Sequence, residues 1–318
     1  MTADFLDQMA EGSRQRAEAA KRECPEADLL ARALASPLPP RLRRDAAGFD
    51  LIAEMKLRSP AVGQLKSGDE DVNARVTAYA HAGAAAVSVL TEPSRFDGSM
   101  AHLELATRVL TPLQVPAMRK DFIVDAYQVS EARVAGAGGV LVILRMLPRA
   151  ELDALIDRAR ELQLFVLLEA FDAADIELMH DIVAGHSNSG VEMLAGVNCR
   201  DLTTLQIVPP RLDELAHLLP TTVPRVAESG VGSAEDARRV AAVGYELALV
   251  GSALMQGGDP RALAAAMLEA GRGARGAQQG ARQAHVGGTA RGTGDGGSAH
   301  AGHDAHGTGG GGSARERH

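Results

Sequence analysis

Lysine and carboxylate side chains stand at the ends of several short apolar runs in this chain, where an unpaired charge would be costly. Lys120 ends one such run, and Glu169 ends another. An ammonium group held in a dry site can protonate an oxygen on which charge develops, and a nearby carboxylate can accept a proton. The sequence therefore predicts acid–base chemistry. The other residues placed in this way are Glu54, Lys56, Asn198, Arg200 and Glu228.

Eight short apolar runs alternate with amphipathic helical stretches between residues 51 and 251. Continuous apolar runs are typical of parallel strands that are buried on both faces. Eight such units over about 200 residues predict an α/β fold, a (β/α)8 TIM barrel. A doubly wound parallel sheet is the alternative, which the lack of a Gly-x-Gly-x-x-Gly turn after the first run disfavours. The expected strands are Leu51–Met55, Ala85–Leu90, Val115–Arg119, Gly139–Leu144, Leu164–Glu169, Leu194–Asn198, Arg225–Glu228 and Leu247–Val250.

The chain divides into three expected regions. Helical patterns within residues 1–48 predict an N-terminal extension that caps one end of the barrel. Residues 49–270 form the catalytic barrel. Residues 271–318 contain few large apolar side chains, so we expect a disordered Gly/His-rich tail. Half of the ten histidines lie in this tail, but their spacing fits no compact ligand set, and we predict no metal site there.

Composition excludes several classes of protein. A net charge of -8 and the absence of tryptophan argue against nucleic-acid binding. The chain has two cysteines, Cys24 and Cys199, and no apolar stretch long enough to span a bilayer. We therefore expect a reduced cytoplasmic protein with no membrane or nucleic-acid partner. No long exposed apolar stripe is apparent, so a monomer is expected.

The charged strand ends are expected to meet, because the active site of such a barrel lies at the carboxyl ends of its strands. Strand side chains alternate, so Glu54 and Lys56 face one side together, as do Asn198 and Arg200. A structural ion pair and a catalytic pair are both open for Glu54 and Lys56. Cations outnumber carboxylates at this end, and an anionic substrate would balance them. The groups counted are Lys56, Lys120 and Arg200 against Glu54 and Glu169.

Small, uncharged turns follow the last two expected strands. Ser229 and Gly230 come after the seventh, and Gly251 and Ser252 come after the eighth. Such turns let backbone N–H groups approach a phosphate at a helix N-terminus. Phosphate sites in this fold lie after these two strands, so the anion is predicted to be a phosphorylated small molecule.

Five motifs occur in order at consistent spacing. They are Ile52-Ala53-Glu54-Met55-Lys56-x-x-Ser59-Pro60, Ser88-Val89-Leu90-Thr91-Glu92-x-x-x-Phe96-x-Gly98-Ser99, Arg119-Lys120-Asp121-Phe122-Ile123-Val124-Asp125-x-Tyr127-Gln128, Gly196-Val197-Asn198-x-Arg200-x-Leu202 and Glu228-Ser229-Gly230. Together they resemble indole-3-glycerol-phosphate synthase of tryptophan biosynthesis. The resemblance runs from the N-terminal helix to about Leu268 and leaves out the tail.

The resemblance implies a carboxy-lyase that closes an indole ring. Its substrate, 1-(2-carboxyphenylamino)-1-deoxyribulose 5-phosphate, is cyclised with loss of carbon dioxide and then water, without cofactor or metal. Lys120 would be the general acid that protonates the ketone oxygen. Glu169 and Glu54 would serve the dehydration as base and acid support. Lys56 would contact the substrate carboxylate and could protonate the leaving hydroxyl, so the division of these later roles stays open.

Substrate contacts are also implied by the resemblance. Asn198, grouped with the catalytic residues, and Arg200 would orient the substrate, while Phe96 and Phe122 would line the aryl pocket. Lys56 is further expected to lower the pKa of Lys120, because a neighbouring cation disfavours the protonated form. The other expected contacts, chiefly to the phosphate, are Ser59, Glu228, Ser229, Gly230, Leu249, Gly251 and Ser252.

Two positions depart from the commoner family pattern. Ala61-Val62-Gly63 stands where Ser-Lys-Gly is common, and Cys199 stands where a second asparagine is usual. The first change falls in a loop that is mobile in lidded barrels, and we expect it to affect turnover rather than the chemistry. Cys199 is out of phase with its neighbours, so we expect it to pack away from the pocket.

Two other functions are compatible with a phosphate-binding barrel. Phosphoribosylanthranilate isomerase would need a cysteine and an aspartate where this chain has Glu54, Lys56 and Glu169. A non-catalytic duplicate used as a binding module is disfavoured by intact Lys120 and Glu169. Service in a secondary pathway stays open.

Overall fold

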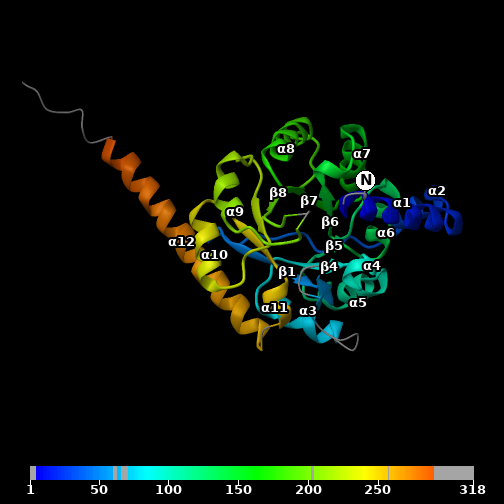
Figure 1. The fold of residues 1–318 in the computed structure, drawn as a ribbon, viewed down its shortest axis with the longest axis horizontal. Coiled ribbons are helices and arrows are strands. Elements are labelled where there is room, and N and C mark those ends of the chain that lie inside the picture. Colours follow the sequence, from blue (N-terminus) through cyan, green and yellow to red (C-terminus); the bar gives the residue numbers. More distant parts are fainter. Residues whose placement is uncertain (1–4, 60–62, 66–70, 202–203, 257, 290–318) are drawn as a thin grey trace, which may run out of the picture. The chain divides into compact units, whose positions relative to one another are not determined.

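A closed barrel of parallel strands forms the centre of this computed structural model (Figure 1). The structure describes residues 5–59, 63–65, 71–201, 204–256 and 258–289. Each barrel strand pairs with the next one along the chain, and the last closes onto the first, so the predicted (β/α)8 barrel is confirmed. The strands are β1 (Asp50–Met55), β4 (Ala86–Leu90), β5 (Ala117–Lys120), β6 (Gly139–Ile143), β7 (Phe165–Ala170), β8 (Met193–Asn198), β9 (Arg225–Glu228) and β10 (Leu247–Val250).

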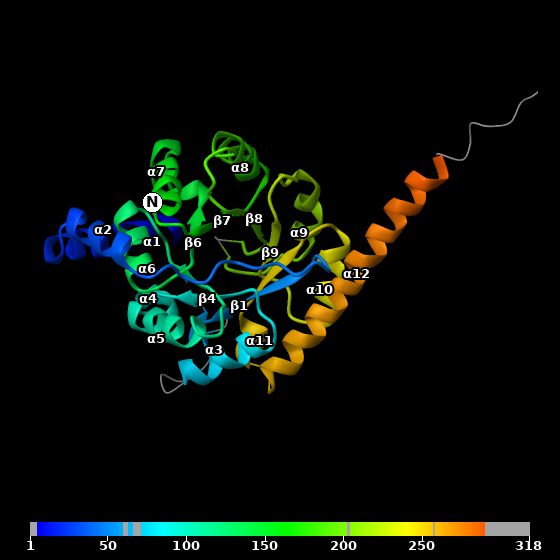
Figure 2. The ribbon, with the colours of Figure 1, turned by 180° about the vertical axis from the view of Figure 1, so that it is seen from behind.

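Helices surround the strands on the outside (Figures 1 and 2). Several of them begin where an aspartate or serine side chain accepts a hydrogen bond from a first-turn backbone N–H, which is the usual N-cap. These caps are Asp71, Ser99, Asp125, Asp172 and Ser233. The helices of the barrel are α3 (Val72–His81), α4 (Pro93–Phe96), α5 (Met100–Leu110), α6 (Ala126–Val134), α7 (Arg149–Glu161), α8 (Ala173–Gly185), α9 (Pro210–Leu215), α10 (Ala234–Ala242), α11 (Ser252–Gln256) and α12 (Pro260–Thr289), with 3-10 turns at Leu144–Met146 and Ala216–Leu218.

Side-chain alternation divides the core into two layers. Inward-pointing residues of the strands form one buried cluster inside the barrel, and outward-pointing residues pack with the helices in a larger one. The same alternation brings Glu54, Lys120, Glu169 and Glu228 to the inner face, each two residues beyond an apolar residue of the inner cluster. The inner cluster includes Ile52, Met118, Leu141, Leu167, Leu194, Val226 and Leu247.

The N-terminal extension consists of α1 (Phe5–Glu23) and α2 (Glu26–Ala35). It is fixed to α6, because the single Tyr127 O–H points between the carbonyl oxygens of Ala20 and Cys24, which lie 3.0 and 2.9 Å from the hydroxyl oxygen. Lys21 also pairs with Asp125, the cap of α6, at 2.6 Å. These contacts hold the end of α1 against the start of α6.

A short hairpin in the loop after β1 was not predicted. Its strands are β2 (Arg58–Ser59) and β3 (Gly63–Gln64), which pair in antiparallel register. The family departure at Ala61 and Val62 falls between them, outside the described residues.

Helix α12 continues past the boundary expected at residue 270 and ends at Thr289. The chain divides into two compact units, Met1–Gln279 with the barrel and Gly280–His318, and α12 extends from the first into the second. Gly271 approaches Phe49 so closely that a Cβ there would lie 2.1 Å from the ring. Arg272 donates to the Phe49 carbonyl at 3.1 Å and pairs with buried Asp50 at 3.2 Å. Residues 271–275 therefore belong to the barrel unit, and residues 290–318 lie outside the described residues.

Truncation should separate these two parts of the expected tail. A chain ending at residue 270 loses the Arg272 contact to buried Asp50, and we expect its Tm to fall by at least about 5 °C. A chain ending at residue 279 keeps that contact and should melt within about 1 °C of the full chain. Differential scanning fluorimetry of the three proteins checks this. Equal Tm values for both truncations would show that Arg272 contributes nothing.

Candidate active site

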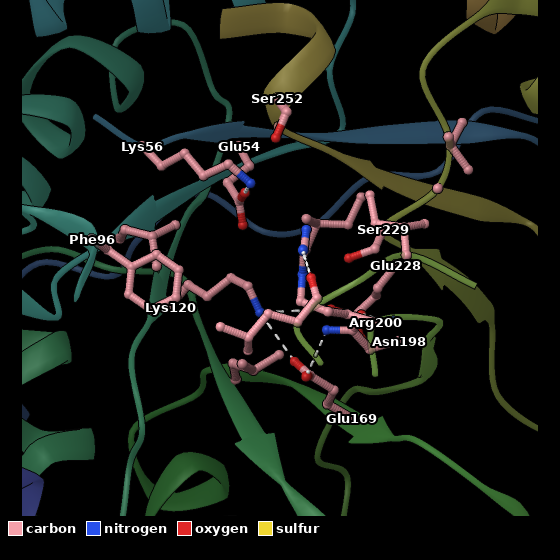
Figure 3. Close-up of a pocket in the computed structure, with 18 of the residues that line it drawn as sticks. Glu54, Lys56, Phe96, Lys120, Glu169, Asn198, Arg200, Glu228, Ser229 and Ser252 are labelled. Carbon is pink, nitrogen blue, oxygen red and sulfur yellow. Dashed lines mark hydrogen bonds and ion pairs between the residues drawn. The ribbon is translucent and has the colours of Figure 1, made fainter. Parts of the chain in front are cut away.

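A cavity of about 410 Å³ opens at the carboxyl ends of the strands (Figure 3). Its walls bring together almost every residue that the sequence predicted for the site. Ser59 lies in β2, and its side chain falls outside the described residues. The predicted residues that line the cavity are Glu54, Lys56, Phe96, Lys120, Phe122, Glu169, Asn198, Arg200, Glu228, Ser229, Gly230, Leu249, Gly251 and Ser252.

Lys120 lies at the end of β5 and points into the cavity among carboxylates. Its Nζ is 3.0 Å from Glu169 Oε2 and 3.7 Å from Glu228 Oε2. Burial alone would lower the pKa of Lys120, but Glu169, Glu228 and Glu54 outweigh it and raise that pKa above the ordinary lysine value. The predicted lowering by Lys56 was therefore wrong. Lys120 is a fully protonated ammonium at neutral pH.

Lys56 and Glu54 form a tight pair on the other side of the cavity. Lys56 Nζ is 2.6 Å from Glu54 Oε1, and the Glu54 side chain is buried. Burial would raise the pKa of Glu54, yet the cations Lys56 and Lys120 lower it below its usual value. Gly251 makes room for this pair, because a Cβ there would lie 2.3 Å from Glu54 Oε1. The positive charge of Lys56 is thus balanced by Glu54 rather than directed at Lys120.

Asn198 and Glu169 are joined by a hydrogen bond whose donor and acceptor can be assigned. The Asn198 side-chain nitrogen donates to Glu169 Oε1 at 2.9 Å, and Asn198 Oδ1 accepts from the Arg200 backbone N–H at 3.0 Å. The backbone bond fixes which way the amide points, so its NH2 group must face the carboxylate. The Arg200 guanidinium lines the cavity and donates to the Leu205 carbonyl at 2.7 Å. Glu169 is consequently held between an amide and the Lys120 ammonium.

Glu228 is a third carboxylate in this group; the sequence predicted it as a substrate contact but not as a neighbour of Lys120. It is 1% exposed, and neither carboxylate oxygen has a hydrogen-bond partner among the described residues. Gly196 provides the space, since a Cβ there would lie 2.2 Å from Glu228 Oε1. Burial and the neighbouring Glu169 raise the pKa of Glu228 well above its ordinary value, and Lys120 only partly offsets them. The three carboxylates Glu54, Glu169 and Glu228 come from alternate strands, as one layer of a barrel does.

The Glu228 carboxyl should lower the free energy of unfolding as pH rises. Because its pKa is raised in the folded state, stability is lost between the unfolded value of about 4.3 and the higher folded value. Glu228→Gln removes that loss, so we expect the Tm of the variant relative to wild type to increase from pH 5 to pH 8. Scanning fluorimetry across this range measures it, with Glu177→Gln on exposed α8 as the control. A Tm difference that stays constant or shrinks with pH would contradict the raised pKa.

The turns after β9 and β10 line the cavity with backbone. Ser229 and Gly230 both have left-handed φ angles, 63° and 69°, which turn the chain sharply at the cavity wall. Gly230 packs directly over Cys199, because a Cβ would lie 2.8 Å from the sulfur. Cys199 is fully buried in the outer core, so its predicted packing role is confirmed. Ser252 begins α11, whose first backbone N–H groups have no partner within the helix.

Aromatic rings cover the remaining wall. Phe96 and Phe122 both line the cavity and pack against each other, with ring centroids 6.2 Å apart. Phe5 of α1 packs edge-on against Phe122 at 5.9 Å, and Leu6 also lines the cavity. Neither Phe5 nor Leu6 was predicted for the site, because an apolar pattern at the start of a helix is equally typical of packing.

Two classes of feature are absent from the described part of the chain. It contains no cluster of three or more histidine, cysteine or acidic side chains able to hold a metal ion. None of the helices described is both long and apolar enough to cross a membrane.

Known proteins match most of the chain. The model of the family described as "Indole-3-glycerol phosphate synthase" matches residues 6–267. An indole-3-glycerol phosphate synthase from Micrococcus luteus is 39% identical over 274 residues, which are 83% of this chain and 98% of that protein. One from a Nocardioides species is 44% identical over 237 residues, or 74% and 86% of the two chains.

Solved structures share the fold at low identity. The 3-hexulose-6-phosphate synthase of Salmonella typhimurium has a TM-score of 0.55 at 13% identity, covering 71% of this chain and all of that one. That likeness shows the barrel alone. The family match spans nearly the whole region that builds the cavity, and the full-length relatives agree with it. This chain belongs to the indole-3-glycerol phosphate synthase family.

Proposed function

We propose that this chain closes the indole ring of 1-(2-carboxyphenylamino)-1-deoxyribulose 5-phosphate in tryptophan biosynthesis, with Lys120 as the general acid. The observation that carries the proposal is a buried ammonium at the centre of the cavity, 3.0 Å from Glu169. The aryl carbon that bears the carboxylate attacks the ketone carbon, and the ketone oxygen takes a proton from Lys120 Nζ. Loss of carbon dioxide then restores the aromatic ring.

The carboxylates around Lys120 set its charge state for this step. They keep the ammonium protonated until the substrate ketone replaces one of their contacts. Oxygen becomes more basic as the new carbon–carbon bond forms, so the proton moves only when charge develops. The dry, enclosed cavity strengthens that interaction relative to water.

Dehydration completes the reaction. We assign Glu169 as the base that removes the proton from the carbon next to nitrogen, because Asn198 and Lys120 fix both of its oxygens. Lys56 is the group that protonates the leaving hydroxyl, with Glu54 holding its ammonium at 2.6 Å. Water and indole-3-glycerol phosphate are then the products of this step.

Each part of the substrate is bound by side chains or backbone groups of matching chemistry in the cavity wall. Phe96 and Phe122 hold the aryl ring, and Lys56 and Arg200 attract the carboxylate and orient the chain of the sugar. The phosphate binds to backbone N–H groups of the two turns, a mode that needs no cation. The residues of this phosphate site are Ser229, Gly230, Gly251 and Ser252, joined by Ser59 from the loop after β1, while Glu228 and Leu249 line the floor.

The enzyme needs no metal or cofactor for these steps, since every proton transfer is assigned to a side chain. We further propose that it works as a monomer in the cytoplasm. Few large apolar side chains of the described residues are exposed, which favours a monomer.

Turnover by the purified full chain tests the proposal. Indole fluorescence should appear when the aryl ribulose phosphate is added, and mass spectrometry should identify indole-3-glycerol phosphate. A preparation treated with EDTA should be equally active. No fluorescence above a protein-free blank, from protein shown to be folded by circular dichroism, would contradict the function.

A further inference from the structure

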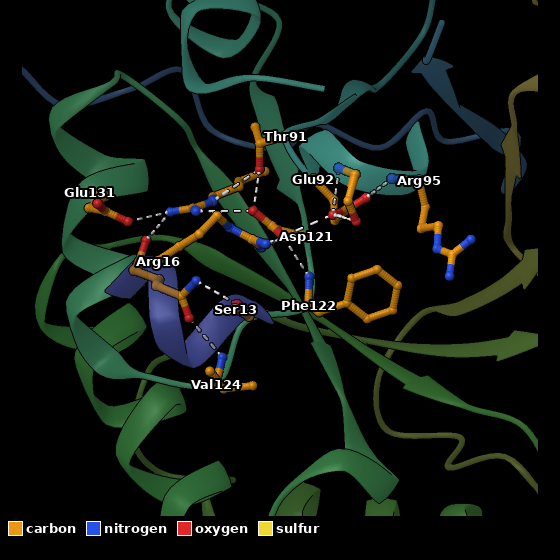
Figure 4. Close-up of polar contacts among 12 residues, drawn as sticks. Ser13, Arg16, Thr91, Glu92, Arg95, Asp121, Phe122, Val124 and Glu131 are labelled. Carbon is orange, nitrogen blue, oxygen red and sulfur yellow. Dashed lines mark hydrogen bonds and ion pairs between the residues drawn. The ribbon is translucent and has the colours of Figure 1, made fainter. Parts of the chain in front are cut away.

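A buried polar network ties the end of β5 to the N-terminal extension (Figure 4). Its centre is Asp121, whose side chain is 1% exposed. Asp121 Oδ2 accepts hydrogen bonds from the Thr91 hydroxyl at 2.7 Å and from Arg119 at 3.1 Å. Asp121 Oδ1 accepts from the Phe122 backbone N–H at 2.9 Å and from Arg16 of α1 at 2.9 Å. Four donors bind one carboxylate. One of them is the backbone N–H of Phe122, whose ring lines the cavity.

Arg119 is the residue of the network that lies within a barrel strand and connects Asp121 to α6. It neighbours Lys120 in β5 but points to the outer side, by strand alternation. Its guanidinium also donates to Glu131 at 3.0 Å and to the Gln128 carbonyl at 2.8 Å, both on α6. Arg16 is the contribution of the extension to Asp121.

Arg16 also faces a second buried carboxylate. Its Nη1 lies 3.8 Å from Glu92 Oε1, and the Glu92 side chain is 1% exposed. Glu92 caps α4 by accepting hydrogen bonds from the backbone N–H groups of Ser94 and Arg95 at 2.8 and 2.7 Å. The α4 helix ends at Phe96. Arg16 therefore lies between the carboxylate that holds Phe122 and the one that orients the helix of Phe96.

The same helix reaches these rings from a second direction. Phe5, about three turns earlier in α1, packs against the Phe122 ring at 5.9 Å. We call Phe5, Phe96 and Phe122 the aryl clamp, since all three line one wall of the cavity. Helix α1 thus fixes Phe122 at its ring through Phe5 and at its backbone through Arg16 and Asp121.

Charge explains why the arginine matters. Asp121 and Glu92 are both buried, and a buried carboxylate that loses a cation is disfavoured. Without Arg16, Asp121 keeps Arg119, whereas Glu92 loses the cation that pairs with it among the described residues. The Arg16 side chain itself is 33% exposed, so its removal leaves no large cavity but opens a path for water. Asp121 and Glu92 would then shift toward that water, and the Phe122 backbone and α4 would shift with them.

We propose that Arg16 is a positioning residue for substrate binding, which sets the spacing of the aryl clamp by bridging Asp121 and Glu92. The inference rests on the proposed function, in which the clamp holds the aryl ring of the substrate. Arg16 touches neither substrate nor reacting atoms in this account. Lys120, held by Glu169 and Glu228 inside the barrel, keeps its own contacts when Arg16 is replaced.

Steady-state kinetics should show a selective effect on binding. Arg16→Ala is expected to raise KM at least about tenfold while kcat stays within about threefold of wild type, as loss of uniform binding does. Arg16→Lys should recover part of the loss, because an ammonium can pair with one carboxylate but lacks the fork to bridge two. Arg14→Ala, an exposed arginine of the same helix, is the matched control and should leave both constants unchanged.

Calorimetry with two ligands separates positioning from stability. The borohydride-reduced substrate keeps the aryl group but cannot cyclise, whereas ribulose 5-phosphate lacks the aryl group. We expect Arg16→Ala to weaken the first about tenfold and the second by less than twofold. Equal weakening of both ligands, or a lower Tm with unchanged KM in the folded variant, would overturn the role of Arg16. Either result leaves the proposed function intact if wild type turns over; a wild type without turnover contradicts the function itself.

Discussion

Lys120→Ala is expected to lower kcat at least about a hundredfold, which is the scale of a lost general acid. Lys120 Nζ is the cation that contacts both Glu169 and Glu228, at 3.0 and 3.7 Å. Lys56 cannot replace Lys120 as the acid, because its ammonium is held 2.6 Å from Glu54 on the other side of the cavity. Stopped-flow indole fluorescence under saturating substrate measures the change.

Lys120→Arg is the sharper companion variant. It keeps the positive charge among the three carboxylates, so the fold keeps its charge balance, but a guanidinium does not release its proton in this pH range. We expect arginine to restore the Tm lost in the alanine variant without restoring kcat. An arginine variant within about tenfold of wild-type kcat would remove proton transfer by Lys120 from the mechanism.

Glu169→Gln should be the second most damaging substitution, with kcat reduced about a hundredfold. Glu169 accepts from Lys120 through Oε2 and from Asn198 through Oε1, so both oxygens already have donors. A glutamine oxygen could still accept from Asn198, but its NH2 group would then face the Lys120 ammonium, donor against donor. The variant loses the base and misplaces the acid side chain slightly.

The two variants should fail at different steps. Glu169→Gln leaves the ammonium able to protonate the ketone, so ring closure and decarboxylation continue while dehydration slows. Rapid quench with mass spectrometry should therefore reveal a ring-closed, decarboxylated species that still carries the hydroxyl. Glu151→Gln, an exposed glutamate on α7, is the control and should match wild type. Absence of that species, with unchanged substrate, would transfer Glu169 to the first step.

The site could be located from the sequence for two reasons. Side-chain alternation within a strand is a local property, and the barrel fold brings all the strand ends to one rim. Period-two alternation places Glu54 with Lys56 and Asn198 with Arg200 on the cavity side, and the strand ends of a barrel share one rim. The structure confirms the barrel and this shared rim. The proposed roles of these residues stay predictions.

Partners across the barrel could not be predicted in the same way. Whether Lys56 acts on Lys120 or on Glu54 depends on the relative positions of separate strands and on the space left by Gly251. Glu228 reaches Lys120 only because Gly196 on the neighbouring strand has no side chain. These are tertiary consequences of glycines that look like ordinary strand residues in the sequence.

Both ends of the described chain make contacts that the sequence did not predict. The pattern around Phe5 predicted a helix but not that its first residues would enter the cavity wall. Beyond residue 270, Gly271 suggested the end of order, yet its missing Cβ is what lets α12 pack against Phe49. A glycine in a polar segment indicates flexibility or close approach equally well, and only the packed structure decides between them.

Release of carbon dioxide, measured together with indole formation in the same single-turnover reaction, tests the central claim most directly. If Lys120 protonates the ketone during ring closure, Lys120→Ala loses both signals in equal proportion, and unreacted substrate remains. Glu169→Gln should instead release carbon dioxide well ahead of indole. Carbon dioxide release at the wild-type rate by Lys120→Ala would contradict the assignment of Lys120 as the acid of the first step.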